Sequence, residues 1–462
     1  MTHSRPAVSA APEGTANLLI DYYDTLREVA EEFDAVPRAA SAAPGTCVPA
    51  FALPEPTAQV REFLEVARVR WRGAGEYRDQ RLHLLDLALN PGTNTTKTFP
   101  SLLIVARAVE HIRTTGRPLV IFSPTSGNKG TALRDAVHRA IRAGLVTPDQ
   151  LRIMVLAPHS SAAKLRQDGL SRDPELAALN PLCTLDSPRA EDVKALGREF
   201  VDTYAARIHE RTGALLWFSL ELNNYLLADV ARALFEHDVH PVDQAAAART
   251  HVHAVSSAFG LLGYHRGRQY LERSGLSDIA RRPHSLLVQH LSTPDMVLSL
   301  RSGGFERTGL PAYRLEQADG LYHQDADAHF PSVTEDPDEL LDPTFYTHRP
   351  ATSPLMNDII ARHGGDGIVV SGRECRERYP LIRELLAEAG VALPRDFAAL
   401  HERSLVMAMT GAFNAIDRSL IKPDHELVVH GSGWYTAEHY TPLGTAVRPV
   451  ATAADLAREL AP

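Results

Sequence analysis

Short apolar stretches alternate with segments of helical periodicity along most of the chain. Each apolar stretch has the length of a buried strand, and the segments between them repeat apolar residues at the spacing of a helix. Strands are predicted at 118–122, 151–157, 183–185, 215–219, 252–255, 286–289 and 426–429. Helices are predicted at 98–116, 130–143, 161–168, 189–212, 223–237, 261–274, 377–389 and 403–416. Repeating strand–helix units predict an α/β protein with doubly wound parallel sheets, in which ligands bind at the carboxyl ends of strands.

The N-terminal part and one later segment depart from this pattern. Residues 1–16 are small, polar and proline-containing, and are expected to be disordered. Helical spacing predicts a helix over 17–33 and another over 60–72, joined by an Ala/Pro linker at 34–56. Residues 316–352 are acidic and rich in His and Pro, which predicts a long surface insertion that could serve as a lid.

Composition and charge exclude several classes of function. A chain of 462 residues is too long for one simple core, so two or more domains are expected. A net charge of −9 argues against a nucleic acid or an anionic membrane as the main partner. No apolar run approaches the ~20 residues that cross a bilayer, and the N-terminus lacks a hydrophobic signal core, which predicts a cytoplasmic protein. Cys47, Cys183 and Cys375 are scattered, so neither a disulfide framework nor a zinc cluster is expected.

The loop after the predicted strand at 118–122 reads Ser-Pro-Thr-Ser-Gly-Asn-Lys-Gly and opens a helix. Its glycines allow close backbone approach, and its hydroxyls and amides can surround an anion at a helix N-terminus. The other interpretation is an ordinary strand–helix turn in which Thr125, Ser126 and Asn128 serve as capping residues.

Two further loops follow predicted strands. Residues 255–264, Val-Ser-Ser-Ala-Phe-Gly-Leu-Leu-Gly-Tyr, lead into a helix whose N–H groups could hold a phosphate, although a Ser-capped helix start explains them equally. Residues 428–435, Val-Val-His-Gly-Ser-Gly-Trp-Tyr, place Ser432 in a glycine-flanked turn. Each loop alone is weak evidence, whereas three such loops with one isolated lysine are stronger.

That lysine is Lys97, in Asn-Pro-Gly-Thr-Asn-Thr-Thr-Lys-Thr-Phe-Pro. A buried amine needs a carbonyl partner or a counter-ion, and the loop at 123–130 supplies donors rather than carboxylates. Lys97 and this loop therefore suggest an aldehyde cofactor held by the lysine, with a carboxylate substrate on the loop. The amine must be neutral to act as a general base, so its pKa must fall from about 10.4. The alternative is a surface lysine on a loop.

These motifs resemble the fold-type II (tryptophan synthase β-like) family of pyridoxal-phosphate enzymes. Residues 94–98 with the apolar helix after them resemble the segment that carries the Schiff-base lysine, and Pro124–Gly130 closely matches the asparagine loop. Within the family the chain is most similar to threonine synthases, through 223–229 and Phe259–Tyr264.

The resemblance implies a role for each matching residue, with pyridoxal 5′-phosphate as the cofactor and Lys97 as the catalytic residue. The residues implied to bind the cofactor are Lys97, Asn128, Ser256, Ser257, Ala258, Phe259, Gly260 and Ser432. The residues implied to bind the substrate carboxylate are Thr125, Ser126 and Gly127. An amino-acid substrate and a homodimer are implied in the same way, with no membrane or nucleic-acid partner.

The resemblance also implies two doubly wound parallel-sheet domains with the cofactor in the cleft between them. Residues 1–59 would form an N-terminal extension and linker. Residues 60–117 with 246–462 would form the large cofactor-binding domain. Residues 118–245 would form the small domain with the substrate loop, and 316–352 would be a surface insertion.

The predicted function is a lyase or synthase acting on an amino acid by β- or γ-elimination and replacement. A neutral hydroxyl such as that of Ser432 leaves the pyridine nitrogen mostly unprotonated, which favours these reactions over transamination. Two departures keep other readings open: Thr98 follows the lysine where threonine synthases have an acidic residue, and 256–258 contains fewer glycines than the family pattern. One alternative is a degenerate member that binds an amino acid or a partner protein. Another is a nucleotide-binding α/β enzyme, although no Gly-x-Gly-x-x-Gly or Gly-Lys-Ser/Thr motif is present.

Histidines give weaker signals. His323, Asp325, Asp327 and His329 alternate as metal ligands could, but acidic loops of this kind are usually solvated, so no metal site is predicted. The histidines near predicted strands are interpreted as packed or surface residues rather than catalysts. They are His251, His253, His265 and His290.

Overall fold

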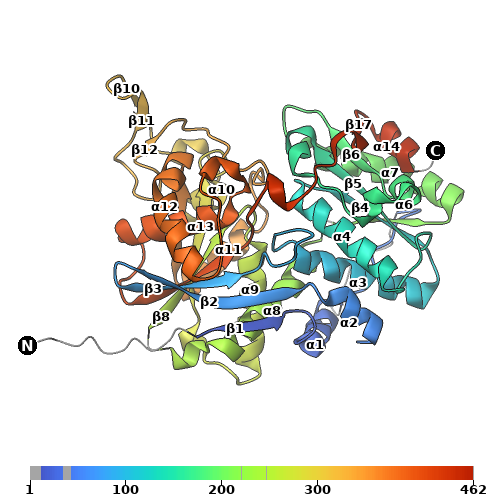
Figure 1. Cartoon of the computed structure of the whole chain (residues 1–462), viewed down its shortest axis with the longest axis horizontal. Helices are drawn as coiled ribbons and strands as arrows, with labels where there is room; N and C mark the ends of the chain where they lie inside the picture. The colour runs from blue at the N-terminus through green and yellow to red at the C-terminus, as the bar shows by residue number, and fades with distance from the viewer. Residues whose placement is uncertain (1–11, 35–42, 220, 246, 461–462) are drawn as a thin grey trace, which may run out of the picture.

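The computed structural model describes residues 12–34, 43–219, 221–245 and 247–460. The disorder predicted for the first eleven residues, and part of the linker predicted at 34–56, lie outside these ranges. Figure 1 shows two lobes side by side, each built around one β-sheet, with the long strands of the larger sheet extending along the base of the molecule.

The large sheet has seven strands within the described residues, in the order β1-β2-β3-β15-β8-β9-β13. Its strands are β1 (Gly14–Asn17), β2 (Arg68–Tyr77), β3 (Gln80–Asp86), β8 (Ala248–Ala254), β9 (His284–His290), β13 (Gly365–Val370) and β15 (His425–Gly431). The first three pair antiparallel, and β3, β15, β8, β9 and β13 are parallel. The parallel part is the one expected of repeated strand–helix units.

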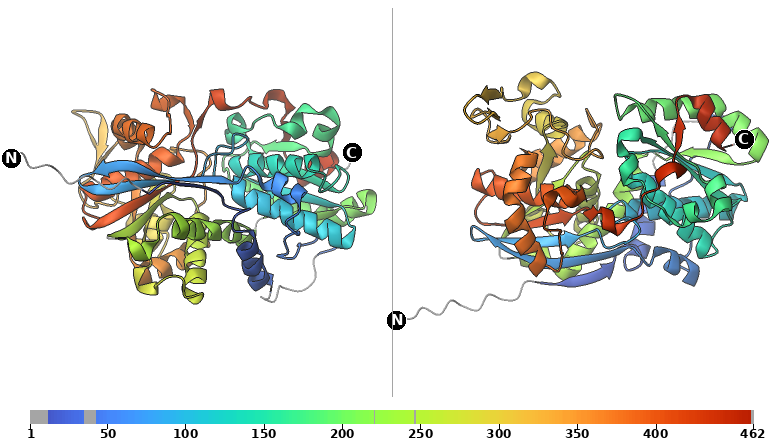
Figure 2. Two further views of the ribbon diagram at one scale, coloured as in Figure 1. Left: turned by 60° about the horizontal axis from the view of Figure 1, so that its bottom comes forward. Right: turned by 45° about the horizontal axis from the view of Figure 1, so that its top comes forward.

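The small sheet, as far as the structure describes the chain, has five parallel strands in the order β17-β6-β5-β4-β7. Its strands are β4 (Leu119–Pro124), β5 (Leu151–Pro158), β6 (Leu182–Leu185), β7 (Leu215–Phe218) and β17 (Arg448–Val450). Strand β17 comes from the C-terminal segment, which crosses from the large lobe to the small one (red in Figure 2). The division predicted from the sequence had assigned these C-terminal residues to the large domain.

Helices cover both faces of each sheet. The main helices are α1 (Tyr23–Asp34), α2 (Ala58–Leu64), α3 (Thr98–Thr115), α4 (Asn128–Arg142), α7 (Asp192–Thr212), α8 (Leu222–Val239), α9 (Phe259–Arg273), α10 (Asp295–Ser302), α11 (Ser353–His363), α12 (Gly372–Glu388), α13 (Ser404–Asp417) and α14 (Ala453–Leu460). In β15, Leu427 and Val429 pack with residues of α12 and α13, whereas Val428 packs with residues of α8 and α9 on the other face. Successive side chains of a strand point to opposite faces, so helices on both sides of the sheet bury alternate residues of each strand. The predicted fold class is confirmed.

Several predicted elements differ in the structure. The helix predicted over 60–72 ends at Leu64 as α2, and β2 begins at Arg68. Residues 14–16, within the segment expected to be disordered, form β1 together with Asn17 and pair with β2. The short helix predicted at 161–168 is a 3-10 helix over His159–Lys164.

The segment 316–352 is not a single surface excursion. Its first part contains three short strands, β10 (Arg314–Glu316), β11 (Leu321–His323) and β12 (Val333–Thr334), which project from the large lobe in Figure 1. Its last part, from Thr344 onward, lines an internal cavity. No helix within the described residues is long and apolar enough to span a bilayer.

Candidate active site

A cavity of about 510 Å³ lies at the carboxyl ends of β4, β8 and β15. The carboxyl ends of β4 in the small sheet and of β8 and β15 in the large sheet both face this cavity, which is why three distant segments contribute to one site. Ten of the eleven predicted site residues line the cavity. They are Lys97, Thr125, Ser126, Asn128, Ser256, Ser257, Ala258, Phe259, Gly260 and Ser432. Of the eleven, Gly127 alone is not a lining residue.

Lys97 directly precedes α3, and its side chain opens on the cavity. Its Nζ lies 6.0 Å from the centre of the Tyr225 ring. Burial lowers the pKa of Lys97 below its ordinary value of 10.5; Arg232 lowers it further, while Asp229 and Glu402 oppose the change. Shielding from bulk water therefore favours a neutral amine, which is the form that acts as a nucleophile or base.

Hydrogen bonds within the asparagine loop fix its conformation. Thr125 Oγ1 accepts the backbone N–H groups of Gly127 at 3.2 Å and Gly130 at 3.1 Å. Gly127 has φ of +121°, a conformation that a side chain would strain, so its role is to form the turn. The Thr125 hydroxyl still has its own proton to donate towards the cavity.

Asn128 is oriented by two contacts. Its Nδ2 donates to Glu402 Oε2 at 2.6 Å, and its Oδ1 accepts from the Tyr435 hydroxyl at 2.9 Å. Glu402 is buried and also lies 3.4 Å from the Lys164 ammonium, which Asp342 binds at 2.7 Å. The second N–H of the Asn128 amide is left for a ligand, because an amide has two donors.

A second buried lysine, Lys129, follows Asn128 in the same loop. Its Nζ donates to the backbone oxygen of Ser219 at 2.8 Å and lies 5.3 Å from the centre of the Tyr225 ring. Burial, followed by the charges of Lys97 and Lys194, lowers the pKa of Lys129 to about 7. The cavity therefore contains two amines with lowered pKa, one of them held by a backbone carbonyl.

The segment 256–260 forms the loop between β8 and α9. Ala258 adopts the left-handed conformation with φ of +50°, and α9 begins at the next residue. A Cβ on Gly260 would lie 2.6 Å from Arg232 Nη1 and 2.6 Å from His253 Cε1, so only glycine fits there. The loop and the positive end of a fifteen-residue helix make an anion-binding geometry at this wall of the cavity.

Ser432 lies in the turn after β15. Its backbone oxygen accepts the N–H of Thr96 at 2.7 Å, which ties this turn to the segment that carries Lys97. The side chain is buried, and its hydroxyl has no hydrogen-bond partner among the described residues. A buried hydroxyl without a partner is costly, so this atom fits a ligand that donates or accepts there.

The sequence interpretation missed the floor of the cavity. Tyr225, Asp229 and Arg232 line it from one face of α8, at the i, i+4 and i+7 spacing that could have revealed them. Arg232 pairs with Asp229 at 2.6 Å and donates to Thr96 Oγ1 at 2.6 Å. Its guanidinium thus holds the side chain of Thr96, the residue before Lys97.

His253, interpreted from the sequence as a packed residue, also lines the cavity. Burial lowers its pKa well below 6.5, and nearby Arg232 and Lys97 act in the same direction, so the ring is neutral. Of the alternating residues of the acidic segment, only Asp327 and His329 are in contact with each other among the described contacts. His323 contacts Asp319, and His329 contacts Asp327 and Asp366.

The fold resembles that of known enzymes. It is the mixed α/β fold of fold-type II pyridoxal-phosphate enzymes: yeast threonine synthase is similar with a TM-score of 0.50 and 12% identity, over 84% of this chain and 79% of that chain. Escherichia coli threonine synthase has a TM-score of 0.47 and 15% identity, over 84% and 74% of the two chains. The O-acetylserine-dependent cystathionine β-synthase of Helicobacter pylori has a TM-score of 0.44 and 14% identity, over 80% and 93%. At these identities the similarity concerns the fold alone.

The chain belongs to the Family of unknown function (DUF6002), whose profile matches residues 14–461. No curated protein matches the sequence.

Proposed function

We propose that the protein is a pyridoxal-phosphate-dependent enzyme that acts on an amino acid by β- or γ-elimination and replacement. The observation that carries the proposal is the convergence of Lys97, the 256–260 loop and Ser432 on one cavity. These are three different partners for three different groups of the cofactor: an amine for its aldehyde, backbone N–H groups for its phosphate and a hydroxyl for its ring nitrogen. The threonine synthase-like fold supports the same choice of cofactor.

The residues present fit this cofactor. The unpartnered Ser432 hydroxyl fits a pyridine nitrogen, which accepts one hydrogen bond. The 256–260 loop lines the cavity at the start of α9 and fits a phosphate, because a helix N-terminus binds anions. Tyr225 and Phe259 stack with ring centres 4.5 Å apart and give this wall of the cavity an aromatic surface.

The chain's own groups suit proton transfer at an amino-acid Cα. The cofactor, when bound, supplies an electron sink for that carbon. Lys97, whose pKa is lowered by burial, can accept the Cα proton and return one to the leaving group or product. Thr125 and Ser126 can donate to the substrate carboxylate. Ser432 carries no charge and does not hold a proton on the ring nitrogen, which favours elimination and replacement over transamination.

Reductive labelling tests the cofactor assignment directly. The chain contains five lysines, Lys97, Lys129, Lys164, Lys194 and Lys422, so peptide mapping after borohydride reduction of the loaded protein distinguishes every candidate. We expect the label on Lys97, with the visible absorbance of the bound cofactor lost in Lys97→Ala and kept in Lys422→Met, whose lysine is exposed. A wild-type protein that takes up no cofactor, or a label on Lys129, contradicts the proposal.

A substrate panel tests the reaction. Loaded protein is incubated with serine, homoserine and their activated derivatives, and keto acid, replacement product and chirality of the remaining amino acid are measured. Elimination or replacement supports the assignment; inversion alone, or transamination, excludes it. Cofactor binding with no turnover of any substrate favours the alternative, a degenerate member that binds an amino acid or a partner protein. We also propose a homodimer, which light scattering of the loaded protein checks.

A further inference from the structure

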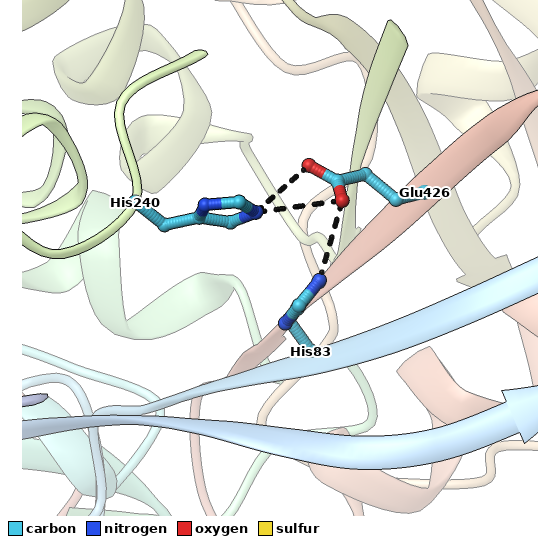
Figure 3. Close-up of side chains that lie close together, drawn as sticks. All are labelled: His83, His240 and Glu426. Atoms are coloured by element: carbon cyan, nitrogen blue, oxygen red, sulfur yellow. Dashed lines mark hydrogen bonds and ion pairs between the residues drawn. The ribbon is translucent and has the colours of Figure 1, made fainter. Parts of the chain in front are cut away.

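A second cluster of ligating side chains lies at the end of β15 opposite to Ser432. His83 comes from β3, Glu426 from β15 and His240 from the C-terminal end of α8, and the three point toward one another (Figure 3). The cluster shares no residue with the candidate active site. Nothing in the proposed reaction uses it.

The spacing of these groups is that of metal ligands. His83 Nε2 lies 3.4 Å from Glu426 Oε2, and His240 Nε2 lies 3.2 Å from Glu426 Oε1 and 3.4 Å from Oε2. One ligand atom from each of the three residues lies within 4.8 Å of the others. Ligands about 2.1 Å from one tetrahedral ion are about 3.4 Å apart, which matches the two imidazole–carboxylate distances.

His83 carries an independent signal. The side chain is 2% exposed, and neither ring nitrogen has a hydrogen-bond partner among the described residues. The approach to Glu426 therefore lacks the geometry of an N–H donated to a carboxylate. A buried imidazole without hydrogen bonds has a ring nitrogen available to bind an ion, and the Trp71 ring lies beside it with 5.5 Å between the ring centres.

Neighbouring charges provide the outer contacts that metal ligands usually have. Arg249 donates to Glu426 Oε1 at 2.7 Å and pairs with Glu236 at 2.6 Å. The bond to Oε1 orients the Glu426 carboxylate and leaves Oε2 directed at both imidazoles. These ion pairs contain two carboxylates for one guanidinium, so a cation is compatible with the local charge.

We propose that His83, His240 and Glu426 form a site for a divalent ion of the zinc class. Two imidazoles and one carboxylate are a ligand set that zinc accepts, with the fourth position open to water. His240 is partly exposed, with 19% of its side chain accessible to solvent, and gives the ion a route of entry. The ion joins β3, β15 and the end of α8, so its binding stabilises the large lobe.

Metal content of the full-length protein tests the proposal. Bound metal is removed from the protein with a chelator, the protein is dialysed against Zn²⁺, and its zinc content is measured by inductively coupled plasma mass spectrometry. Co²⁺ is then added in the same way as a visible-absorbance probe. We expect one Zn²⁺ per chain, a higher melting temperature with Zn²⁺, and a Co²⁺ spectrum typical of tetrahedral nitrogen and oxygen ligands. His83→Gln and His240→Gln should each weaken binding about tenfold or more.

The matched control is His329→Gln, because His329 also lies between two carboxylates, those of Asp327 and Asp366. This variant should keep the ion, the Co²⁺ spectrum and the Zn²⁺-dependent rise in melting temperature. Circular dichroism without metal shows which variants fold, and His240→Gln, at a partly exposed helix end, decides the outcome if His83→Gln does not fold. Equal Zn²⁺ content in wild type and His240→Gln, or no Zn²⁺ in either, overturns the proposal.

Discussion

The buried amine of Lys129 gives the folded protein a stability that depends on pH. Burial, followed by the charges of Lys97 and Lys194, lowers its pKa from 10.5 to about 7. The substitution Lys129→Met keeps a side chain of similar length and removes the titrating group. We predict that it removes a definable part of the pH dependence of the free energy of unfolding.

The direction follows from protonation in the two states. Below about pH 7 Lys129 is protonated in both the folded and the unfolded chain, so folding carries the full cost of burying the charge. Well above pH 10.5 it is neutral in both, and the cost vanishes. This group therefore makes stability rise with pH between about 7 and about 10.5. At about 1.4 kcal/mol per pKa unit the full effect is about 5 kcal/mol, and about 2 kcal/mol of it falls between about pH 7 and about pH 9.

Urea unfolding at about pH 7 and about pH 9 measures this difference. Trp217, buried in β7 two residues before Ser219, serves as the fluorescent reporter near the amine. The lost hydrogen bond to Ser219 lowers the stability of Lys129→Met at both pH values, so the test is the change with pH, not the offset. Wild type and the exposed control Lys422→Met should gain about 2 kcal/mol more than Lys129→Met over this interval. Equal gains in all three proteins refute the reasoning.

Two further substitutions test the floor of the cavity. Gly260→Ala forces a Cβ against Arg232 and His253. It should lower the free energy of unfolding by about 1–3 kcal/mol and the cofactor affinity about tenfold. The control Gly304→Ala, with nothing within 4 Å of its Cβ, should change neither quantity. Arg232→Met should lower the free energy of unfolding by about 3–5 kcal/mol, because it leaves Asp229 buried without its partner. Adding Asp229→Leu should recover part of this loss. If the double variant loses as much stability as the two single variants together, the two residues do not interact.

The strand–helix alternation after residue 118 could be predicted because each unit buries its own apolar face. The prediction failed at 60–72, where the helical spacing of Val60, Phe63 and Leu64 was extended too far. From Arg68 the chain alternates charged and apolar residues with period two, as in Arg-Val-Arg-Trp-Arg, which is a strand signal. The turn to β3 then uses Arg78 and Asp79 at positive φ, a hairpin geometry that the absence of Gly or Asn concealed.

The candidate site could be predicted where short motifs carry it. Lys97, the asparagine loop and Ser432 each follow or precede a predicted element, so the position of the two loops at the carboxyl ends of strands could be inferred. The wall formed by 344–352 could not, because it depends on a long segment without periodicity folding back over the cavity. The role of Glu402 could not be predicted either, because β14 (Leu400–Glu402) is three residues long and has no periodic pattern of its own.

The histidines of the large lobe show what single-residue interpretation loses. Arg249, His251 and His253 alternate along β8, and Glu426 and His430 lie four residues apart on β15, so within each strand these residues point to one face. Taken one at a time each is an ordinary packed residue. Taken with the period of a strand, they predict a polar layer on one side of the sheet.

The helix over that layer has the matching pattern. Asp229, Arg232 and Glu236 recur on one face of α8 at a spacing of three and four residues. Arg232 can only donate, so His430 accepts at Nδ1 (3.0 Å), donates from Nε2 to His251 (2.8 Å), and His251 donates to Glu236 (3.0 Å). The direction of every proton in this series is therefore fixed by the arginine at the cavity. Polar residues at strand spacing in β8 and β15 and at helix spacing in α8 thus predict a buried hydrogen-bonded layer between the sheet and the helix. This layer extends from the candidate active site toward the cluster of His83, His240 and Glu426.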